Sequence, residues 1–336
     1  KNHEFWIGTS YGLNRFDRVS SSFKSYKHNP KNKNSIASNV ITGICPADET
    51  HLWIATLGGG LDYFDTKTTT AKHFRHNPKD VNNISSDSIN CIFKDRQNRL
   101  WIGTPHGIDC LDTKTLKLTS KVLKNSNAVT AITQDYNGFM WFGVDNLGLV
   151  SFDANLNKVL SITNGKSASG FENAILSLLT DRKGAIWIGK VNDGLTQFDT
   201  KNKKTYNYYP GLGIEGGLSS ATISALFEDR QGNLWIGTHR GGVNLYTAGA
   251  DKFKLYRKGS NPNTLNYNDV KAFFQDVDDT IWIGTDGGGL NVMDRKTGKF
   301  SFFKNETNNP KSISSNAIQT IGMDAQKNIW IGTWGS

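Results

Sequence analysis

The sequence predicts an all-β fold made of repeated four-stranded sheets. No 3.6-residue periodicity of apolar side chains competes with the repeat, so helices are not expected. Four short antiparallel strands every ~40–50 residues are typical of the blades of a β-propeller. The tetrapeptide Trp-Ile-Gly-Thr, or a close variant, begins at spacings of 47, 48, 40, 46, 48, 47 and 48 residues, at Trp6, Trp53, Trp101, Trp141, Trp187, Trp235, Trp282 and Trp330.

The first strand of each unit is an apolar run that ends in Asp. Asp, Asn and Gly residues follow it and favour a tight hairpin, so we interpret these aspartates as turn formers. Six of them lie six residues before the next repeat Trp, whereas Asp48 lies five before Trp53. The runs end at Asp48, Asp95, Asp135, Asp181, Asp229, Asp276 and Asp324.

The second strand is the Trp-Ile-Gly-Thr segment, in which Trp and Gly share one face. Because neighbouring sheets cover both faces of a blade, we expect each Trp to be buried in the core. We also expect each Gly to leave room for a bulky side chain of the adjoining blade. After a Gly-rich turn come a third strand of the form GLxxFD, as at 12–17, 60–65 and 194–199, and an aromatic fourth strand, as at 23–26, 205–209 and 300–303.

These units predict one domain, a seven-bladed β-propeller of four-stranded antiparallel blades that spans residues 1–336. Six whole blades are centred on Trp53, Trp101, Trp141, Trp187, Trp235 and Trp282. Residues 1–26 and 313–328 are expected to form a composite closing blade, because ring closure removes exposed sheet edges. One second strand, at Trp6 or Trp330, is then surplus. We expect residues 329–336 to be displaced or to begin a further repeat array, and eight incomplete blades are the alternative.

Composition narrows the function classes. Lys and Arg total 39 against 30 Asp and Glu, a net charge of +9, which favours anionic partners. The basic residues are spread over turns and linkers, so we expect no nucleic acid to bind. No apolar run approaches the ~18 residues of a membrane span, and residues 1–20 do not form a secretory leader. Cys45, Cys91 and Cys110 form no C-x-x-C pair and are expected to be free, packed thiols.

The repeat D-x-x-G-x-(L/I/M)-W-(I/F)-G-T-x-x-G-G-L-x-x-F-D, together with the linkers at 28–39, 76–87 and 308–316, resembles the two-component regulator propeller repeats. The resemblance covers essentially the whole chain. It implies a periplasmic sensor ectodomain of a bacterial hybrid two-component system, which binds an oligosaccharide and signals across the inner membrane to a histidine kinase that these residues do not contain. The implied partners are a further propeller and a β-sandwich of the same protein, with a homodimer as another option. No cofactor or metal is expected.

We predict the ligand site on the rim that carries the Gly-rich turns and the connections between blades, because irregular loops on a repeated scaffold usually carry function. Tyr11 could stack on a sugar face, while Lys190 and Arg240 could pair with carboxylate or sulfate. His106 and His239 are also explained as solvated turn residues, and the stretch 27–34 as a solvated linker. The candidate site residues are Tyr11, His106, Asp145, Asn146, Lys190, Asn192, Asp193, His239 and Arg240, and the long connections add Lys166, Glu172, Asn173 and Glu215.

A binding module is expected rather than an enzyme, because no catalytic motif or singular constellation stands out. The basic balance favours an acidic or sulfated glycan. The alternative is a propeller glycosidase or lyase that acts on a polysaccharide or a cyclic peptide. A glycosidase would use two of Asp145, Glu172, Asp193 and Glu215, and a metal-dependent lyase would use His106 or His239.

Overall fold

The computed structural model describes residues 4–9, 11–17, 22–80, 83–123, 127–153, 158–162, 174–210, 217–247, 253–259, 263–323 and 329–334. Over these ranges the chain forms strands and turns and no helix. Six sheets have four antiparallel strands each, paired in chain order, so the predicted all-β propeller architecture is confirmed.

The six complete blades are numbered in chain order, and each contains one of the six predicted central tryptophans. Blades 1 to 3 are β4 (Ile41–Pro46), β5 (His51–Thr56), β6 (Leu61–Asp65) and β7 (Thr70–Phe74); β8 (Cys91–Lys94), β9 (Arg99–Thr104), β10 (Gly107–Asp112) and β11 (Lys117–Val122); and β12 (Val129–Gln134), β13 (Met140–Val144), β14 (Gly148–Phe152) and β15 (Lys158–Ile162). Blades 4 to 6 are β16 (Ile175–Thr180), β17 (Ile186–Lys190), β18 (Leu195–Asp199) and β19 (Lys204–Tyr208); β20 (Ile223–Glu228), β21 (Leu234–Thr238), β22 (Gly242–Tyr246) and β23 (Phe253–Tyr256); and β24 (Val270–Gln275), β25 (Ile281–Thr285), β26 (Gly289–Met293) and β27 (Phe300–Phe303).

The second strand of each blade lies at the centre of the packing. In blades 3 to 6 every residue of this strand is buried, because both faces of the sheet are covered by neighbouring blades. Trp235, for example, packs in one apolar cluster with Val270, Phe273 and Ile283 of the next blade. The six central tryptophans are at most 6% exposed, which confirms their core role. The side chains of Trp6 and Trp330 lie outside the described part.

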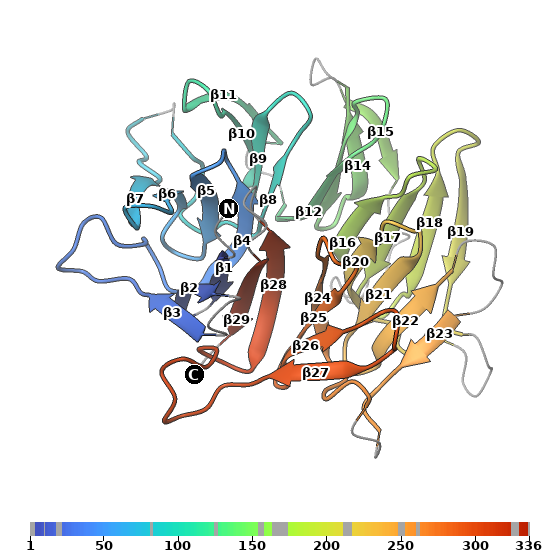
Figure 1. Cartoon of the computed structure of the whole chain (residues 1–336). Helices are drawn as coiled ribbons and strands as arrows, with labels where there is room; N and C mark the ends of the chain where they lie inside the picture. Colours follow the sequence, from blue (N-terminus) through green and yellow to red (C-terminus); the bar gives the residue numbers. More distant parts are fainter. Residues whose placement is uncertain are drawn as a thin grey trace.

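Seven inner strands surround the central axis, although only six blades are complete. Each inner strand contacts the next one around the axis, and β28 (Ala317–Met323) contacts β4. Figure 1 shows β28 in red beside β4 in blue, which places the two ends of the chain side by side. The circle is therefore closed by a strand from the end of the chain.

The place of the seventh blade is filled differently from the prediction. A two-stranded sheet, β28 with β29 (Ile329–Trp334), lies against a three-stranded sheet made of β1 (Glu4–Thr9), β2 (Gly12–Asp17) and β3 (Ser22–Tyr26). The predicted count of seven four-stranded blades is wrong, because β1 and β29 are both second strands of the repeat and each keeps its own sheet. Residues 329–334 are paired with β28 rather than displaced from it, and residues 335–336 lie outside the described part.

The two sheets at this place are nevertheless joined, and we call their junction with the last linker the seam. The side-chain amide of Asn14 donates a hydrogen bond to the hydroxyl of Ser314 at 3.1 Å. The backbone N–H of Phe23 donates to the carbonyl of Lys311 at 3.0 Å. Phe23 is 7% exposed and packs in the same apolar cluster as Ile313 and Trp282 of the C-terminal units. These contacts hold together segments that are 300 residues apart in sequence.

All three cysteines are free, as expected. Burial raises the pKa of the Cys91 thiol to about 12 and that of the Cys45 thiol to about 11. Both thiols therefore stay protonated near neutral pH, which makes them poor nucleophiles and metal ligands.

Candidate functional site

The turns between second and third strands are tied to the inner strands around the axis. In five of the six complete blades, the first residue of this turn donates its backbone N–H to the carbonyl of the residue just before the inner strand of the same blade. Blade 2 has Pro105 at this position, which carries no N–H. The bonds run from Asp145 to Ala128 at 2.9 Å, from His239 to Thr222 at 3.0 Å and from Asp286 to Asp269 at 2.8 Å. Asp145 and His239, both predicted site residues, thus lie on the rim that surrounds the axis.

Three other predicted residues sit at the tips of these turns in a left-handed backbone conformation. Asn146, Asn192 and Arg240 have φ values of 57°, 53° and 59°, and Gly58 occupies the corresponding position in blade 1 with φ 78°. A turn that needs positive φ accounts for Asn and Gly there, because these residues tolerate it best. His106 is exposed at the tip of its own turn, where its backbone N–H donates to the Thr104 hydroxyl at 3.1 Å.

Lys190 stands where other units have Thr, and it is already paired. In most units the Thr hydroxyl donates to the carbonyl that closes the turn, as Thr238 does to Gly242 at 2.7 Å. The Lys190 ammonium instead reaches the Asp193 carboxylate, with Nζ and Oδ2 separated by 2.7 Å. Lys190 is only 9% exposed. The two predicted residues therefore satisfy each other, which removes them from the charges available to a ligand.

His239 belongs to a charged cluster that bridges blades 5 and 6. Its Nδ1 lies 3.0 Å from the Asp269 carboxylate. The Lys271 ammonium lies 3.5 Å from Asp269 Oδ1 and 3.8 Å from Asp286 Oδ2. Asp269, Lys271 and Asp286 were not among the predicted residues. Asp269 and Lys271 stand where the other five complete blades have uncharged residues, and Asp286 corresponds to Asp145 of blade 3.

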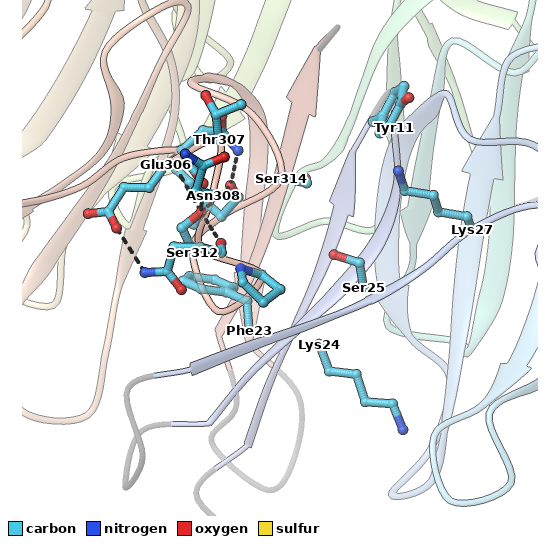
Figure 2. A pocket seen from close by; sticks show the side chains of 14 residues that line it. Tyr11, Phe23, Lys24, Ser25, Lys27, Glu306, Thr307, Asn308, Ser312 and Ser314 are labelled. Atoms are coloured by element: carbon cyan, nitrogen blue, oxygen red, sulfur yellow. Dashed lines mark hydrogen bonds between the residues drawn. The ribbon is translucent and has the colours of Figure 1, made fainter.

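A large hollow lies at the seam rather than on the axis. This seam groove has a volume of about 680 Å³, and one wall comes from the N-terminal sheet while the other is the linker between β27 and β28. Figure 2 shows Tyr11 and Lys27 on one side and Glu306, Thr307 and Asn308 on the other. The groove is lined by Tyr11, Phe23, Lys24, Ser25, Lys27, Asn305, Glu306, Thr307, Asn308, Asn309, Pro310, Ser312, Ile313 and Ser314.

The wall formed by the N-terminal sheet carries an aromatic ring and positive charge. Tyr11 is 37% exposed, and the Lys27 ammonium lies 3.7 Å from the centroid of its ring. Such cation–π contacts hold a ring and a charge together at the surface. Lys24 on β3 also lines the groove, but Figure 2 shows its side chain pointing away from the linker wall, and its ammonium lies 5.3 Å from the centroid of the Tyr26 ring.

The opposite wall is a linker with its own hydrogen bonds. Asn305 donates from its side chain to the Ile313 carbonyl at 2.7 Å, and Asn309 donates to the Glu306 carboxylate at 2.8 Å. The Ser312 hydroxyl accepts the backbone N–H of Glu306 at 2.9 Å. These bonds fix the shape of the wall before any ligand arrives, which lowers the entropic cost of binding.

Of the predicted residues, the structure brings only Tyr11 into the seam groove. Lys24, Lys27 and the asparagines of 305–309 were missed, because 27–34 was interpreted as a solvated linker and 308–316 as a family linker. The predicted splice of residues 1–26 with 313–328 was the signal that could have found them. Lys166, Glu172, Asn173 and Glu215 lie outside the described residues, and the described residues contain no group of three or more His, Cys, Asp or Glu side chains that could hold a metal ion.

The family profile of the two-component regulator propeller matches five segments of the chain, 83–106, 124–146, 217–240, 264–287 and 312–335. The chain carries two-component regulator propeller repeats. Each matched repeat runs from the linker before an inner strand to the turn after the second strand. The family repeat thus corresponds to the hairpin that carries the conserved spacing of Asp and Trp within this chain.

Solved structures show the same fold at low sequence identity. The extracellular domain of BT3049 from B. thetaiotaomicron, described as a hybrid two-component system, superposes with a TM-score of 0.69 at 23% identity and is matched over 98% of this chain and 48% of its own. A streptogramin B lyase superposes with a TM-score of 0.66 at 15% identity, over 89% of this chain and 93% of its own. The virginiamycin B lyase of Staphylococcus aureus superposes with a TM-score of 0.65 at 12% identity, over 88% of this chain and 92% of its own.

The chain of propeller repeats spans about half the length of the BT3049 structure. No curated protein matches its sequence significantly. Over the residues that the structure describes, none of the elements is a helix of the length and apolar character that crossing a membrane requires.

Proposed function

We propose that the chain is a ligand-sensing propeller of a hybrid two-component system and that it binds an oligosaccharide in the seam groove. The observation that carries this proposal is the composition of the groove: one exposed aromatic ring, the Lys27 ammonium beside it and a facing wall of amides and hydroxyls. Its volume of about 680 Å³ falls within the ~300–1,000 Å³ typical of ligand pockets. A ligand of several sugar units fits this size better than a single ring.

The groove offers the contacts that sugars use. The ring of Tyr11 can cover the C–H face of a pyranose, and the side chains of Asn308 and Thr307 can exchange hydrogen bonds with its hydroxyls. Lys27 favours a ligand that carries carboxylate or sulfate, in keeping with the net charge of +9. We therefore place an acidic or sulfated oligosaccharide ahead of a neutral one for this groove.

The sensor role is inferred from the repeats and from the domain organisation of similar proteins. The matched family is named for two-component regulators, and the BT3049 structure is an extracellular domain. We infer a periplasmic location, a histidine kinase as the output module, and a further propeller and β-sandwich of the same protein as neighbours. A homodimer would bring two such chains together.

Binding is favoured over catalysis at this groove. A glycosidase needs two carboxylates that face one bond. Among the described lining residues, Glu306 is the single carboxylate, and it is held by Asn309 at 2.8 Å. Of the carboxylates considered for a glycosidase, Asp193 is paired with Lys190 at 2.7 Å.

The proposal is tested by binding of oligosaccharide digests from neutral and from sulfated polysaccharides. We expect at least one fraction to raise the melting temperature of the protein without new reducing ends or unsaturated products. Tyr11→Ala should weaken the binding of that fraction about tenfold or more, where each factor of ten corresponds to ~1.4 kcal/mol of binding free energy. For a sulfated fraction, affinity should also fall between low salt and ~0.5 M, because the Debye length shortens to a few Å.

Tyr136→Ala is the matched control, because Tyr136 is also an exposed tyrosine under a cation, with Arg96 Cζ 4.8 Å from its ring centroid. It lies outside the groove and should leave affinity unchanged. Equal affinity of Tyr11→Ala and the unmodified protein would contradict the proposal. Release of new reducing ends would replace it with the glycosidase alternative.

A further inference from the structure

A second hollow lies on the axis, where the inner strands share an irregularity. In six of them the ladder to the second strand skips one residue near the strand's start, as between Ile41 and Gly43 in β4. Such a bulge leaves one residue outside the pairing and re-aims its side chain. The skipped residues are Thr42, Thr130, Leu176, Ser224, Lys271 and Gln319.

Five of these bulge residues line a common cavity of about 290 Å³, which we call the shaft-mouth pocket. Asn90, at the corresponding place before β8, also lines it. The seam groove shares no residue with this pocket. The complete lining is Val40, Ile41, Thr42, Leu57, Asn90, Leu176, Ser224, Lys271 and Gln319.

Three polar side chains of the pocket donate hydrogen bonds to backbone carbonyls of the neighbouring blade. The Thr42 hydroxyl donates to the Ile89 carbonyl at 2.7 Å, and the Asn90 amide donates to the Val129 carbonyl at 3.0 Å. The Ser224 hydroxyl donates to the carbonyl of Val270 at 2.6 Å. Each bond joins one blade to the next. The hydroxyls of Thr42 and Ser224 then have only oxygen lone pairs to offer, whereas the Asn90 amide keeps its oxygen and one N–H. These three residues therefore offer mainly acceptor oxygens, which favours a ligand with hydroxyl donors, while Lys271 and Gln319 can donate to it.

Lys271 is the one charged residue among those lining the pocket, and two nearby carboxylates balance its charge. Its ammonium lies 3.5 Å from Asp269 and 3.8 Å from Asp286, distances at which ion pairing persists but a good hydrogen bond does not. Asp269 is 6% exposed, and its Oδ1 has no hydrogen-bond partner among the described residues. Two carboxylates near one ammonium disfavour an anionic ligand because they repel it. The ammonium itself disfavours a cationic ligand for the same reason.

We propose that the shaft-mouth pocket is a second binding site, which takes a small neutral polyhydroxyl ligand of about one sugar ring. Its volume of about 290 Å³ lies just below the ~300–1,000 Å³ range of ligand pockets, as suits a ligand of one ring. Hydroxyl groups of the ligand donate to the oxygens of Thr42, Asn90 and Ser224, and Lys271 donates to a ring or hydroxyl oxygen. Leu57 and Leu176 cover the apolar C–H groups. This proposal does not depend on the seam groove.

Leu176→Trp tests the site by filling it. Leu176 is 36% exposed at its bulge, so a larger side chain extends into the pocket without displacing core residues. Leu255→Trp makes the same change at a 40% exposed leucine on the outer strand β23 and serves as the control. The probes are D-glucose, D-galactose, D-mannose and L-fucose, with D-glucuronate and D-glucosamine as charged counterparts. Binding of each probe is measured by ligand-detected NMR titration.

We expect at least one neutral sugar to bind the unmodified protein and the control equally, and Leu176→Trp to weaken it at least tenfold. The affinity should not change between low salt and ~0.5 M, since a neutral ligand is not screened. Tyr11→Ala should leave it unchanged, which separates this site from the seam groove. Binding of none of the neutral sugars, equal binding by Leu176→Trp, or tighter binding of D-glucuronate or D-glucosamine would overturn the proposal.

Discussion

At the scale of single residues, the repeated Asp is more than a turn former. In five blades its carboxylate accepts a hydrogen bond from the indole N–H of the Trp six residues later, at 2.8–2.9 Å. The other carboxylate oxygen accepts backbone N–H groups of the turn, as Asp181 does from Lys183 and Ala185. One side chain thus closes the hairpin and satisfies a buried donor, which explains the six-residue spacing.

Blade 1 shows what happens when the spacing changes. Asp48 lies one residue closer to its Trp, and the Nε1 of Trp53 is buried with no hydrogen-bond partner among the described residues. Asp48 instead contacts His51 and accepts a hydrogen bond from the Tyr63 hydroxyl at 2.8 Å. The shift of one residue therefore costs the indole its partner.

We predict that Asp181→Asn destabilises the protein by about 1–3 kcal/mol, the usual cost of leaving a buried donor unsatisfied. The amide can still accept from the backbone through its oxygen, but its NH₂ group cannot accept from Trp187. Asp199→Asn, at an outer turn of the same blade, is the control and should cost much less. Equal losses in chemical denaturation would mean that the indole bond adds nothing.

At the scale of elements, the glycine of the second strand makes room for the next blade in five of the six complete blades, while blade 1 has Ala55 at this position. A Cβ on Gly143 would meet Cγ2 of Ile175 at 2.7 Å, and one on Gly284 would meet Cγ2 of Ile318 at 2.4 Å. Gly189 and Gly237 face Ile223 and Val270 in the same way. The predicted role of this glycine is confirmed, and the bulky group is a β-branched residue of the adjoining inner strand.

Gly143→Ala should destabilise the protein by about 1–3 kcal/mol, because well-packed blades cannot absorb the extra methyl group without strain. In a protein that already carries Ile175→Ala, the same change should cost clearly less. A double-mutant cycle by denaturant unfolding measures this coupling. Strictly additive losses would show that the clash lies elsewhere.

The linkers between blades were harder to predict than the strands. The sequence shows them as long and variable, yet several place one apolar residue in the core. Ile36, Ile84, Leu218 and Leu265 are at most 2% exposed. The following backbone N–H is held by a polar residue of the third strand, as Ala37 is by Asp62 at 2.8 Å. The sequence of a linker alone does not reveal which of its apolar residues is buried, because the polar residue that holds the next backbone N–H lies on another strand.

At the scale of the whole molecule, closure depends on contacts between the N-terminal sheet and the C-terminal units. We predict that Phe23→Ala destabilises the protein by about 3–5 kcal/mol, as for other buried Phe residues. It should also speed hydrogen exchange at residues 312–318. Phe302→Ala, at a 37% exposed position on β27, is the control. Unchanged stability of Phe23→Ala would show that the seam contributes little to closure.

Repetition is why so much of the architecture could be predicted and why the sites could not. Strand positions and buried tryptophans recur in all six complete blades, and the facing glycine recurs in five of them, so each blade confirms the others. The seam occurs once, where β1 and β29 meet, and its geometry depends on which second strand joins which sheet. The shaft-mouth pocket depends on one-residue bulges at positions such as Lys271, which a period-2 pattern does not reveal.

The central claim, that the seam groove binds an oligosaccharide, is tested most directly by hydrogen exchange on the protein with and without a binding glycan fraction. We predict slower exchange in residues 22–27 and 305–314, with the turns at 57–60 and 239–242 unchanged. Slower exchange at those turns, with no change at the seam, would contradict the claim.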